Sequence, residues 1–355
     1  MEEKAISKYK IAYIIPYFGK LRNDVELWIK TCSYNPSIDF IIITDDETEH
    51  EYPSNVKVIY ERFESIRTKI NILYGFEVAL VRPYKLCDLK PAYGEIFAEY
   101  LKEYDFWGHC DMDMLWGDIR DFITDDVLNA YDKIGFLGHS TLYRNTKEVN
   151  TRYKLKVRDL DYDYVDVFKT DKSCHFDEEY MNILYKDRGW KIYERVCFAD
   201  LTEYHYNFYL TNVEKNRNFD RQIFLWQRGK LNRYYLKNNE IKSDTFMYIH
   251  FLKRKMELRV DNIINSDILL IAPNYITNNY KQDVLDYRFI NEAAKPRWIK
   301  YFIQLYKQKK DTITLSNLPK RLWNRIRKYY LLCKNNENLN DNEKFLKKDR
   351  FNGKS

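Results

Sequence analysis

The first half of the chain alternates between two hydrophobic patterns, one typical of buried strands and one typical of amphipathic helices. Residues 11–16 (IAYIIP) form a continuous apolar run, as expected for a strand that is buried on both faces of a parallel sheet. Further strands are predicted at 39–44 and 56–60, and helices at 24–32 and 63–74. This regular alternation predicts an α/β fold with a doubly wound sheet.

The pattern beyond residue 80 is less regular. Asp88 is followed by apolar residues at helical spacing, so we expect it to cap a helix that leads into a strand at 105–110. The pair Arg228-Gly229 lies between two aromatic runs and predicts a hairpin turn. The acidic run 159–166 (DLDYDYVD) alternates like a strand. The remaining predictions are strands at 133–137, 245–252 and 268–272 and a helix at 176–185.

Composition places the chain among globular proteins. Of its 355 residues, 45% are hydrophobic and 32% are charged, which excludes a disordered chain. No apolar run approaches about 18 residues, and residues 1–10 contain acids but no apolar segment, so we expect neither a membrane span nor a secretory signal. The six cysteines include no CxxC pair, which is typical of reduced thiols in a cytoplasm and argues against a disulfide framework or a zinc module.

Positive charge is concentrated towards the C-terminus. Residues 295–334 contain twelve lysines and arginines and a single acid, Asp311, whereas the net charge of the whole chain is +6. We therefore expect a near-neutral body that does not bind nucleic acid, followed by a cationic appendage. Apolar residues recur at helical spacing beside these charges, which predicts helices that lie on an anionic membrane surface. The alternative is that the apolar stripe packs on the body and the charge is solvated.

The candidate chemistry lies in residues 104–119 (YDFWGHCDMDMLWGDI), where an apolar run ends in Asp111-Met112-Asp113. Two carboxylates one residue apart at the end of a strand can both reach one hard divalent cation. The same spacing recurs within 159–163, but no apolar run precedes it there. A turn with solvated aspartates is the alternative at 111–113. A zinc site that includes His109 and Cys110 is disfavoured, because adjacent residues of a strand point to opposite faces.

Strand ends also line the ligand crevice in open α/β sheets. The first predicted strand is followed by PYFGK rather than a GxGxxG motif, so a Rossmann dinucleotide site is not expected. Segments 16–19 and 44–46 are therefore candidates for holding a base and a ribose, and simple turns are the alternative.

With these elements placed, the blocks IIPYFGK, ITDD, YKLCDLKPAYG, DFWGHCDMDMLWGDI and HFLKRKM resemble those of GT-A-fold nucleotide-sugar glycosyltransferases of the bacterial polysaccharide-synthesis type. The resemblance covers roughly residues 10–260, and it extends more distantly to the glycogenin-like and toxin-type retaining families. It implies a GT-A (Rossmann-like) mixed sheet flanked by helices over residues 1–290. A basic amphipathic helical extension would then occupy 291–334, and 335–355 would form a disordered tail.

Position by position, the resemblance implies that Asp111, Asp113 and His250 bind Mn²⁺ or Mg²⁺, although a core histidine is the alternative for His250. Lys253 or Lys255 matches the lysine that contacts the diphosphate. The full set of residues expected to bind the donor is Pro16, Tyr17, Phe18, Asp45, Asp46, Lys85, Asp88, Lys90, Asp111, Met112, Asp113, Lys253 and Lys255.

Two further roles follow from the resemblance. Asp88 and Lys90 match a pair that contacts donor-sugar hydroxyls and ribose. Asp177, with Glu178 as the second choice, matches the acidic start of a helix that faces the donor sugar and takes part in catalysis. A helix N-cap is the alternative role for Asp177.

The implied function is metal-dependent transfer of a sugar from a nucleotide-diphosphate donor, which we expect to be a UDP-sugar. The acceptor would be a surface glycan or a lipid-linked oligosaccharide, the anomeric configuration would be retained, and the enzyme would be cytoplasmic or peripheral on the inner membrane face. A non-catalytic sugar- or nucleotide-binding protein is the main alternative. A phosphatase with an aspartyl nucleophile is disfavoured, because Leu115 stands where such enzymes need a small Thr or Val.

Overall fold

The computed structural model describes residues 7–203, 205–252, 254–280 and 285–295. The predicted basic extension at 291–334 lies outside these residues except for 291–295. Its membrane contact, the tail at 335–355 and Lys253 also lie outside them, so those predictions and the domain limits based on them stay predictions. None of the described helices is long and apolar enough to cross a membrane.

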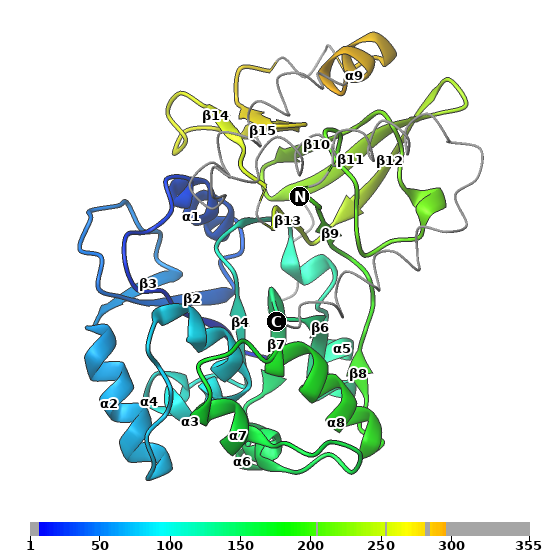
Figure 1. Ribbon diagram of the computed structural model, residues 1–355. Coiled ribbons are helices and arrows are strands. Elements are labelled where there is room, and N and C mark those ends of the chain that lie inside the picture. Colours follow the sequence, from blue (N-terminus) through cyan, green and yellow to red (C-terminus); the bar gives the residue numbers. More distant parts are fainter. Residues whose placement is uncertain (1–6, 204, 253, 281–284, 296–355) are drawn as a thin grey trace, which may run out of the picture. The chain divides into compact units, whose positions relative to one another are not determined.

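A seven-stranded mixed sheet is the centre of the fold (Figure 1). Its order is β3-β2-β1-β4-β7-β6-β8. Strands β1 to β4 run parallel, β7 is antiparallel to β4 and to β6, and β8 is parallel to β6. The strands are β1 (Ile11–Pro16), β2 (Ile38–Thr44), β3 (Val56–Tyr60), β4 (Phe106–Cys110), β6 (Lys133–Leu137), β7 (Ser140–Arg144) and β8 (Ile192–Tyr193). The predicted α/β fold with a large mixed sheet is confirmed.

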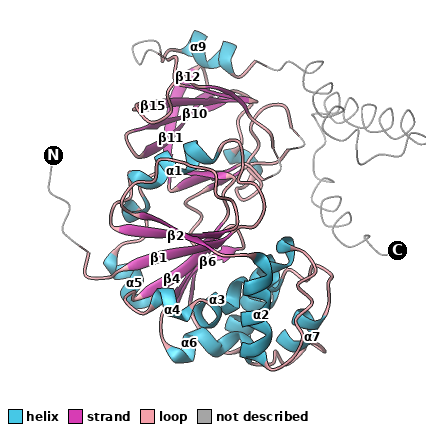
Figure 2. Cartoon of the chain, turned by 90° about the vertical axis from the view of Figure 1, so that its left-hand side faces the viewer, coloured by secondary structure: helices cyan, strands magenta, loops and turns pink. Residues whose placement is uncertain are grey.

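Helices cover both faces of this sheet (Figure 2). Helix α2 (Phe63–Tyr74) packs on one face, where Ala12 and Ile14 of β1 point, and α1 (Val25–Ser33) packs on the other face, against Ile11 and Tyr13. The other described α-helices are α3 (Tyr93–Ile96), α4 (Ala98–Leu101), α5 (Asp125–Ala130), α6 (Lys147–Thr151), α7 (Tyr164–Lys169), α8 (Met181–Asp187) and α9 (Tyr287–Ala293). Alternate side chains of β1 therefore enter two different cores, as the unbroken apolar run requires.

A second, six-stranded sheet has the order β12-β11-β10-β15-β16-β14. Helix α1 lies between the two large sheets, because its Leu27 joins the core of the second sheet while its Trp28 joins that of the first (Figure 2). The strands of the second sheet are β10 (Gln222–Gln227), β11 (Lys230–Lys237), β12 (Glu240–Phe246), β14 (Glu257–Arg259), β15 (Ile268–Ala272) and β16 (Tyr275–Thr277). The predicted hairpin turn is present, since Arg228 and Gly229 both have positive φ, 46° and 81°, between β10 and β11.

A small sheet of three short strands joins these parts. It consists of β5 (Met114–Trp116), β13 (Tyr248–His250) and β9 (Ala199–Asp200), with β13 in the middle. Strand β13 pairs antiparallel with β5 and parallel with β9. This sheet connects the segment after β4 to residues that come more than eighty positions later in the chain.

Three local predictions are wrong. Asp88 caps no α-helix; it lies inside a 3₁₀ segment, Pro83–Ala92, because Pro91 cannot donate a helical hydrogen bond. The run 159–166 is not a strand, since Asp163 and Asp166 form a capping box that starts α7. The expected strand 245–252 is divided at Met247, where the chain leaves β11 as partner and takes up β5 and β9.

Candidate functional site

The central candidate site lies where β4 ends. The backbone N–H of Asp111 donates to the carbonyl of His139 (3.0 Å), and the carbonyl of Asp113 accepts from the N–H of Phe251 (2.9 Å). Pairing of β5 with β13 sets His250 opposite Met114, beside the two aspartates. His250 Nε2 is 3.2 Å from Asp113 Oδ1 and 3.9 Å from Asp111 Oδ2. The three side chains offer ligand atoms within 4.8 Å of one another, so together they could hold a metal ion.

Lys90 is the cation beside this pair of aspartates. Its Nζ donates to Asp111 Oδ1 (2.8 Å) and to the carbonyl of Gly138 (2.7 Å), and it lies 3.8 Å from Asp177 Oδ2. Burial by itself would raise the pKa of Asp111, but Lys90 and His250 outweigh it and lower that pKa to about 2. The Asp111 carboxylate is therefore ionised at neutral pH, as a metal ligand must be.

The electrostatics of His250 differ from those of an ordinary buried imidazole. Burial would lower its pKa, but contacts with Asp113 and Asp200 raise that pKa to about 10. In the metal-free protein His250 is thus charged, and together with Lys90 it balances the negative charge of the Asp111 and Asp113 pair.

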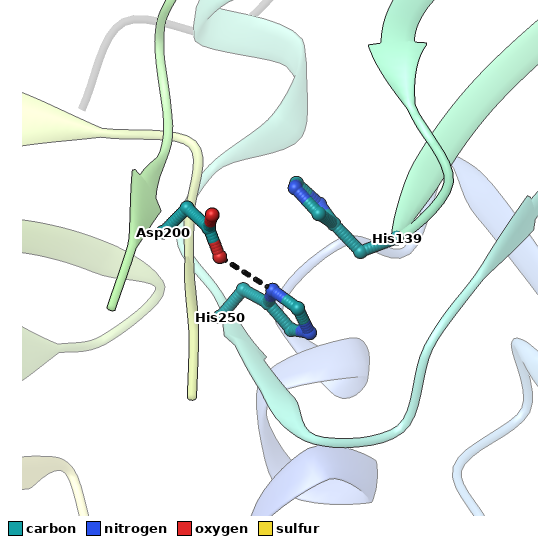
Figure 3. A group of neighbouring side chains, drawn as sticks. All are labelled: His139, Asp200 and His250. Atoms are coloured by element: carbon teal, nitrogen blue, oxygen red, sulfur yellow. Dashed lines mark hydrogen bonds and ion pairs between the residues drawn. The ribbon is translucent and has the colours of Figure 1, made fainter. Parts of the chain in front are cut away.

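Asp200 and His139 were not predicted from the sequence. Asp200 Oδ1 lies 2.8 Å from His250 Nδ1, and the ring of His139 stacks on that of His250 with centroids 4.4 Å apart (Figure 3). Neither residue belongs to a recognisable local motif: His139 follows a glycine, and Asp200 is the last residue of a two-residue strand. No sequence motif could have found them, because only the pairing of β9 with β13 and the turn between β6 and β7 bring them here.

Asp88 connects the 3₁₀ segment Pro83–Ala92 to the acidic turn that begins at Phe176. Its carboxylate accepts from Lys85 Nζ (2.9 Å) and from the backbone N–H groups of Cys174 (3.1 Å) and Phe176 (3.3 Å). Phe176 begins a π-helical turn, Phe176–Tyr180, that continues into α8. Asp88 thus caps this turn from a distant part of the chain and positions Asp177, the residue after Phe176.

Asp177 and Glu178 lie against Gly138, close to Lys90. The N–H of Gly138 donates to Glu178 Oε1 (2.6 Å), and a Cβ at position 138 would lie 2.2 Å from Asp177 Oδ2, so only glycine permits this approach. Burial raises the pKa of Asp177 to about 6, although Lys90 opposes the shift. A carboxyl group that titrates near neutral pH inside a site is a candidate for catalysis.

The predicted base and ribose segments meet at the edge formed by the ends of β1 and β2. Asp45 Oδ1 accepts from the N–H of Gly19 (2.6 Å), and Asp46 Oδ2 accepts from that of Leu21 (2.7 Å). The two aspartates therefore brace the loop that carries Tyr17. Pro16 and Tyr17 are partly exposed beside it.

Several residues predicted to bind the sugar donor have side chains that are buried or already paired. Phe18 packs on Phe63 in the core with ring centroids 5.3 Å apart, and Met112 is also buried in a core. Lys85 is buried in its pair with Asp88. Lys255 is exposed in the loop before β14. Among the lysines that the structure describes, Lys90 is the one whose ammonium group contacts the aspartate pair.

Comparison with known proteins gives a family. A family model matches residues 13–280, which is most of the chain. The chain belongs to the DUF6625 family. This family is described as one of unknown function, and every described candidate site residue, from Pro16 to Lys255, lies within the DUF6625 match. None of the curated proteins matches the chain.

Among solved structures, the DUF6625 chain is similar to the crystal structure of mouse xyloside xylosyltransferase 1 in its apo form. The match covers 55% of this chain and 88% of that chain, with 12% sequence identity and a TM-score of 0.34.

The burial of Asp177 predicts a pH-dependent stability of this DUF6625 protein. Its pKa is raised to about 6 in the folded state, so between about pH 4 and pH 6 the folded state binds more protons than the unfolded state. The free energy of unfolding therefore falls as pH rises through this window, by up to about 3 kcal/mol from this group. Asp177→Asn removes the charge, so we expect it to stabilise the protein by about 1–3 kcal/mol at neutral pH and by much less at about pH 4.

Urea unfolding of both proteins at the two pH values measures this difference. Glu179→Gln, at an exposed position two residues later, is the matched control and should change stability at neither pH. Equal destabilisation by Asp177→Asn at both pH values would contradict the prediction.

Proposed function

We propose that the protein is a metal-dependent glycosyltransferase that moves a sugar from a nucleotide-diphosphate donor, a UDP-sugar, to a surface-glycan or lipid-linked oligosaccharide acceptor. One observation carries the proposal. The carboxylates of Asp111 and Asp113 at the end of β4 meet His250 from β13, with the ammonium group of Lys90 bonded to one of them. In an open α/β sheet, substrates bind in the crevice at the carboxyl ends of the strands. Metal-binding side chains in this place would therefore hold a cation that faces the bound substrate.

The chemistry of the ligands indicates the ion. Two carboxylates and one imidazole suit Mn²⁺ somewhat better than Mg²⁺, which prefers oxygen ligands alone. When bound by Asp111, Asp113 and His250, such an ion would offset the negative charge that develops on a departing nucleoside diphosphate.

The remaining groups of the site fit a donor that carries a diphosphate. Lys90 is a buried cation whose pKa stays well above its usual value, despite burial, because of Asp111 and Asp177. It is therefore charged at all working pH values and adds attraction for an anionic donor. The loop braced by Asp45 and Asp46 would contact the base and ribose, and the buried Asp177 beside Lys90 would contact the donor sugar.

Retention of anomeric configuration is part of the proposal. Such a transfer needs chiefly positioning and stabilisation of the leaving group, both of which this site could supply. An NMR spectrum of the product linkage tests it. An inverted linkage would contradict retention and would assign Asp177, whose pKa of about 6 suits proton abstraction, as the general base.

The binding of donor and metal is expected to be mutually dependent. With UDP at roughly 100 times its Kd and Mn²⁺ present, the free energy of unfolding should rise by about 2.7 kcal/mol, and the Tm by about 4 °C. Thermal unfolding with UDP, with UMP and with each plus Mn²⁺ or EDTA measures this, and release of UDP from a panel of UDP-sugars measures turnover.

Each outcome decides between the functions. A shift that needs both UDP and Mn²⁺, with release of UDP from one sugar nucleotide, supports the transferase. A metal-dependent shift without turnover of any sugar nucleotide would favour the nucleotide-binding alternative. No response to UDP or to other nucleoside diphosphates, with or without Mn²⁺, would contradict the proposed donor.

A further inference from the structure

His250 belongs to two groups of potential ligands. Its Nε2 faces Asp111 and Asp113, whereas its Nδ1 faces Asp200, with His139 stacked on the ring. Both groups satisfy the distances for a metal site, since their ligand atoms lie within 4.8 Å of one another. The two nitrogens of one imidazole point in different directions, so a single ion cannot be bound by both groups. The question is which group would hold an ion and what the other group does.

Asp200 is held firmly against His250. Residue 200 is paired with His250 in the register of β9 and β13, and its Oδ1 lies 2.8 Å from Nδ1. Its other oxygen, Oδ2, accepts from the Thr211 hydroxyl (2.5 Å), and its backbone N–H donates to Asn212 Oδ1 (3.1 Å). Both carboxylate oxygens of Asp200 therefore have a fixed partner, the His250 ring on one side and the Thr211 hydroxyl on the other.

His139 does not complete a second ligand set. Its ring lies at 28° to that of His250, with centroids 4.4 Å apart. The nitrogen lone pairs of an imidazole lie in the plane of its ring. Because the two ring planes are nearly parallel and separated, the lone pairs of both rings cannot point at one ion unless a ring turns. Its Nδ1 already lies 3.0 Å from the Tyr248 hydroxyl. Figure 3 shows His139 beside the His250 ring, with Asp200 at the His250 Nδ1 edge. His139 therefore packs on the face of His250.

We infer that Asp200 is the positioning residue of the metal site, an inference that rests on the proposed function. When His250 gives up its Nε2 proton to bind the ion, Asp200 accepts the hydrogen bond from Nδ1–H and so keeps the remaining proton on Nδ1 and fixes the ring orientation. The Nε2 lone pair then faces the ion beside Asp111 and Asp113. A carboxylate that accepts from the second nitrogen of a metal-binding histidine also raises the basicity of the first. Loss of such a partner typically weakens metal binding by about 10–100-fold.

The test is the Mn²⁺ affinity of the full chain, measured by titration calorimetry and by the electron paramagnetic resonance signal of free Mn²⁺. We expect Asp200→Ala to weaken Mn²⁺ binding about 10–100-fold and Asp200→Asn, whose amide oxygen still accepts from Nδ1–H, to restore part of the loss. Thr211→Val, which frees only Oδ2, should have a smaller effect in the same direction. His139→Phe keeps a stacked ring without a nitrogen and should bind Mn²⁺ within about twofold of the wild type.

The outcomes separate this inference from the proposed function. If the wild type binds no Mn²⁺, both fail. If the wild type binds Mn²⁺, Asp113→Asn does not, and both Asp200 variants bind as tightly as the wild type, only the role of Asp200 is wrong. A loss in His139→Phe as large as that in Asp200→Ala would make His139 and Asp200 direct ligands and overturn the inference. If Asp200→Ala does not fold, the Mn²⁺ affinities of Asp200→Asn and Thr211→Val test the inference: weaker binding than the wild type supports it, and unchanged binding contradicts it.

Discussion

Replacing Asp113 with asparagine should abolish metal-dependent sugar transfer, with a loss of about 10³-fold or more, and leave the protein folded. The substitution removes one of the two carboxylates that face His250 Nε2, and a neutral amide is a poor ligand for a hard divalent ion. The buried His250 keeps Asp200 at 2.8 Å and Asp111 at 3.9 Å, so the substitution leaves no buried charge without a partner. Release of UDP from the donor, with circular dichroism to monitor folding, measures the effect.

The chain supplies a matched control for this experiment. Asp159-Leu160-Asp161 has the same spacing as Asp111-Met112-Asp113, and Asp161 is exposed. Asp161→Asn should therefore leave transfer and metal affinity unchanged. Activity in Asp113→Asn equal to that of Asp161→Asn would show that the aspartate pair does not hold the catalytic ion.

The largest expected effect on stability concerns the buried pair of Lys85 and Asp88. Their side chains are 2% and 4% exposed, and Nζ lies 2.9 Å from Oδ2. Asp88→Ala leaves the Lys85 charge buried without its carboxylate and also removes the acceptor of the N–H groups of Cys174 and Phe176. Breaking such a pair costs about 3–5 kcal/mol, so the free energy of unfolding in urea should fall by that amount.

A double-mutant cycle tests whether this loss comes from the pair. Lys85→Met leaves the buried Asp88 carboxylate without its cation and should also be costly, while the double variant should lose less than the sum of the two single losses. Lys186→Met is the control, since Lys186 lies 3.6 Å from Glu194 and is exposed, and it should change stability by less than about 1 kcal/mol. Additive losses would mean that Lys85 and Asp88 act independently.

Local pattern was sufficient for much of the first sheet. The bounds of β1, β3 and α2 agree with those read from the sequence, because each is an apolar or periodic segment that stops at a proline, a charged residue or a glycine. Pattern failed where partners far along the chain decide the structure. Strands β5 and β9 are three and two residues long, too short to show a period, and they exist because β13 lies between them.

The same distinction applies to the candidate site. Asp111 and Asp113 form a local motif, and the structure places them beside His250 and Lys90, so these residues were within reach of sequence reasoning even though their metal-binding role stays a prediction. Phe18 lies in the PYFGK segment after β1 and Met112 lies between the two aspartates, but both side chains are buried in the core. The spacing of a motif does not show which of its side chains point inward.

The three-stranded sheet also affects the order of events in synthesis. Asp113 leads into β5, but the histidine beside it arrives only with β13, after roughly 135 further residues have been added. At the usual rate of about 5–20 residues per second, the growing chain spends many seconds with the aspartates made and His250 missing. A partly synthesised chain therefore lacks one of the three proposed metal ligands. If the proposed site binds an ion, saturation of that site in a pulse-labelled sample would report that β13 has paired with β5.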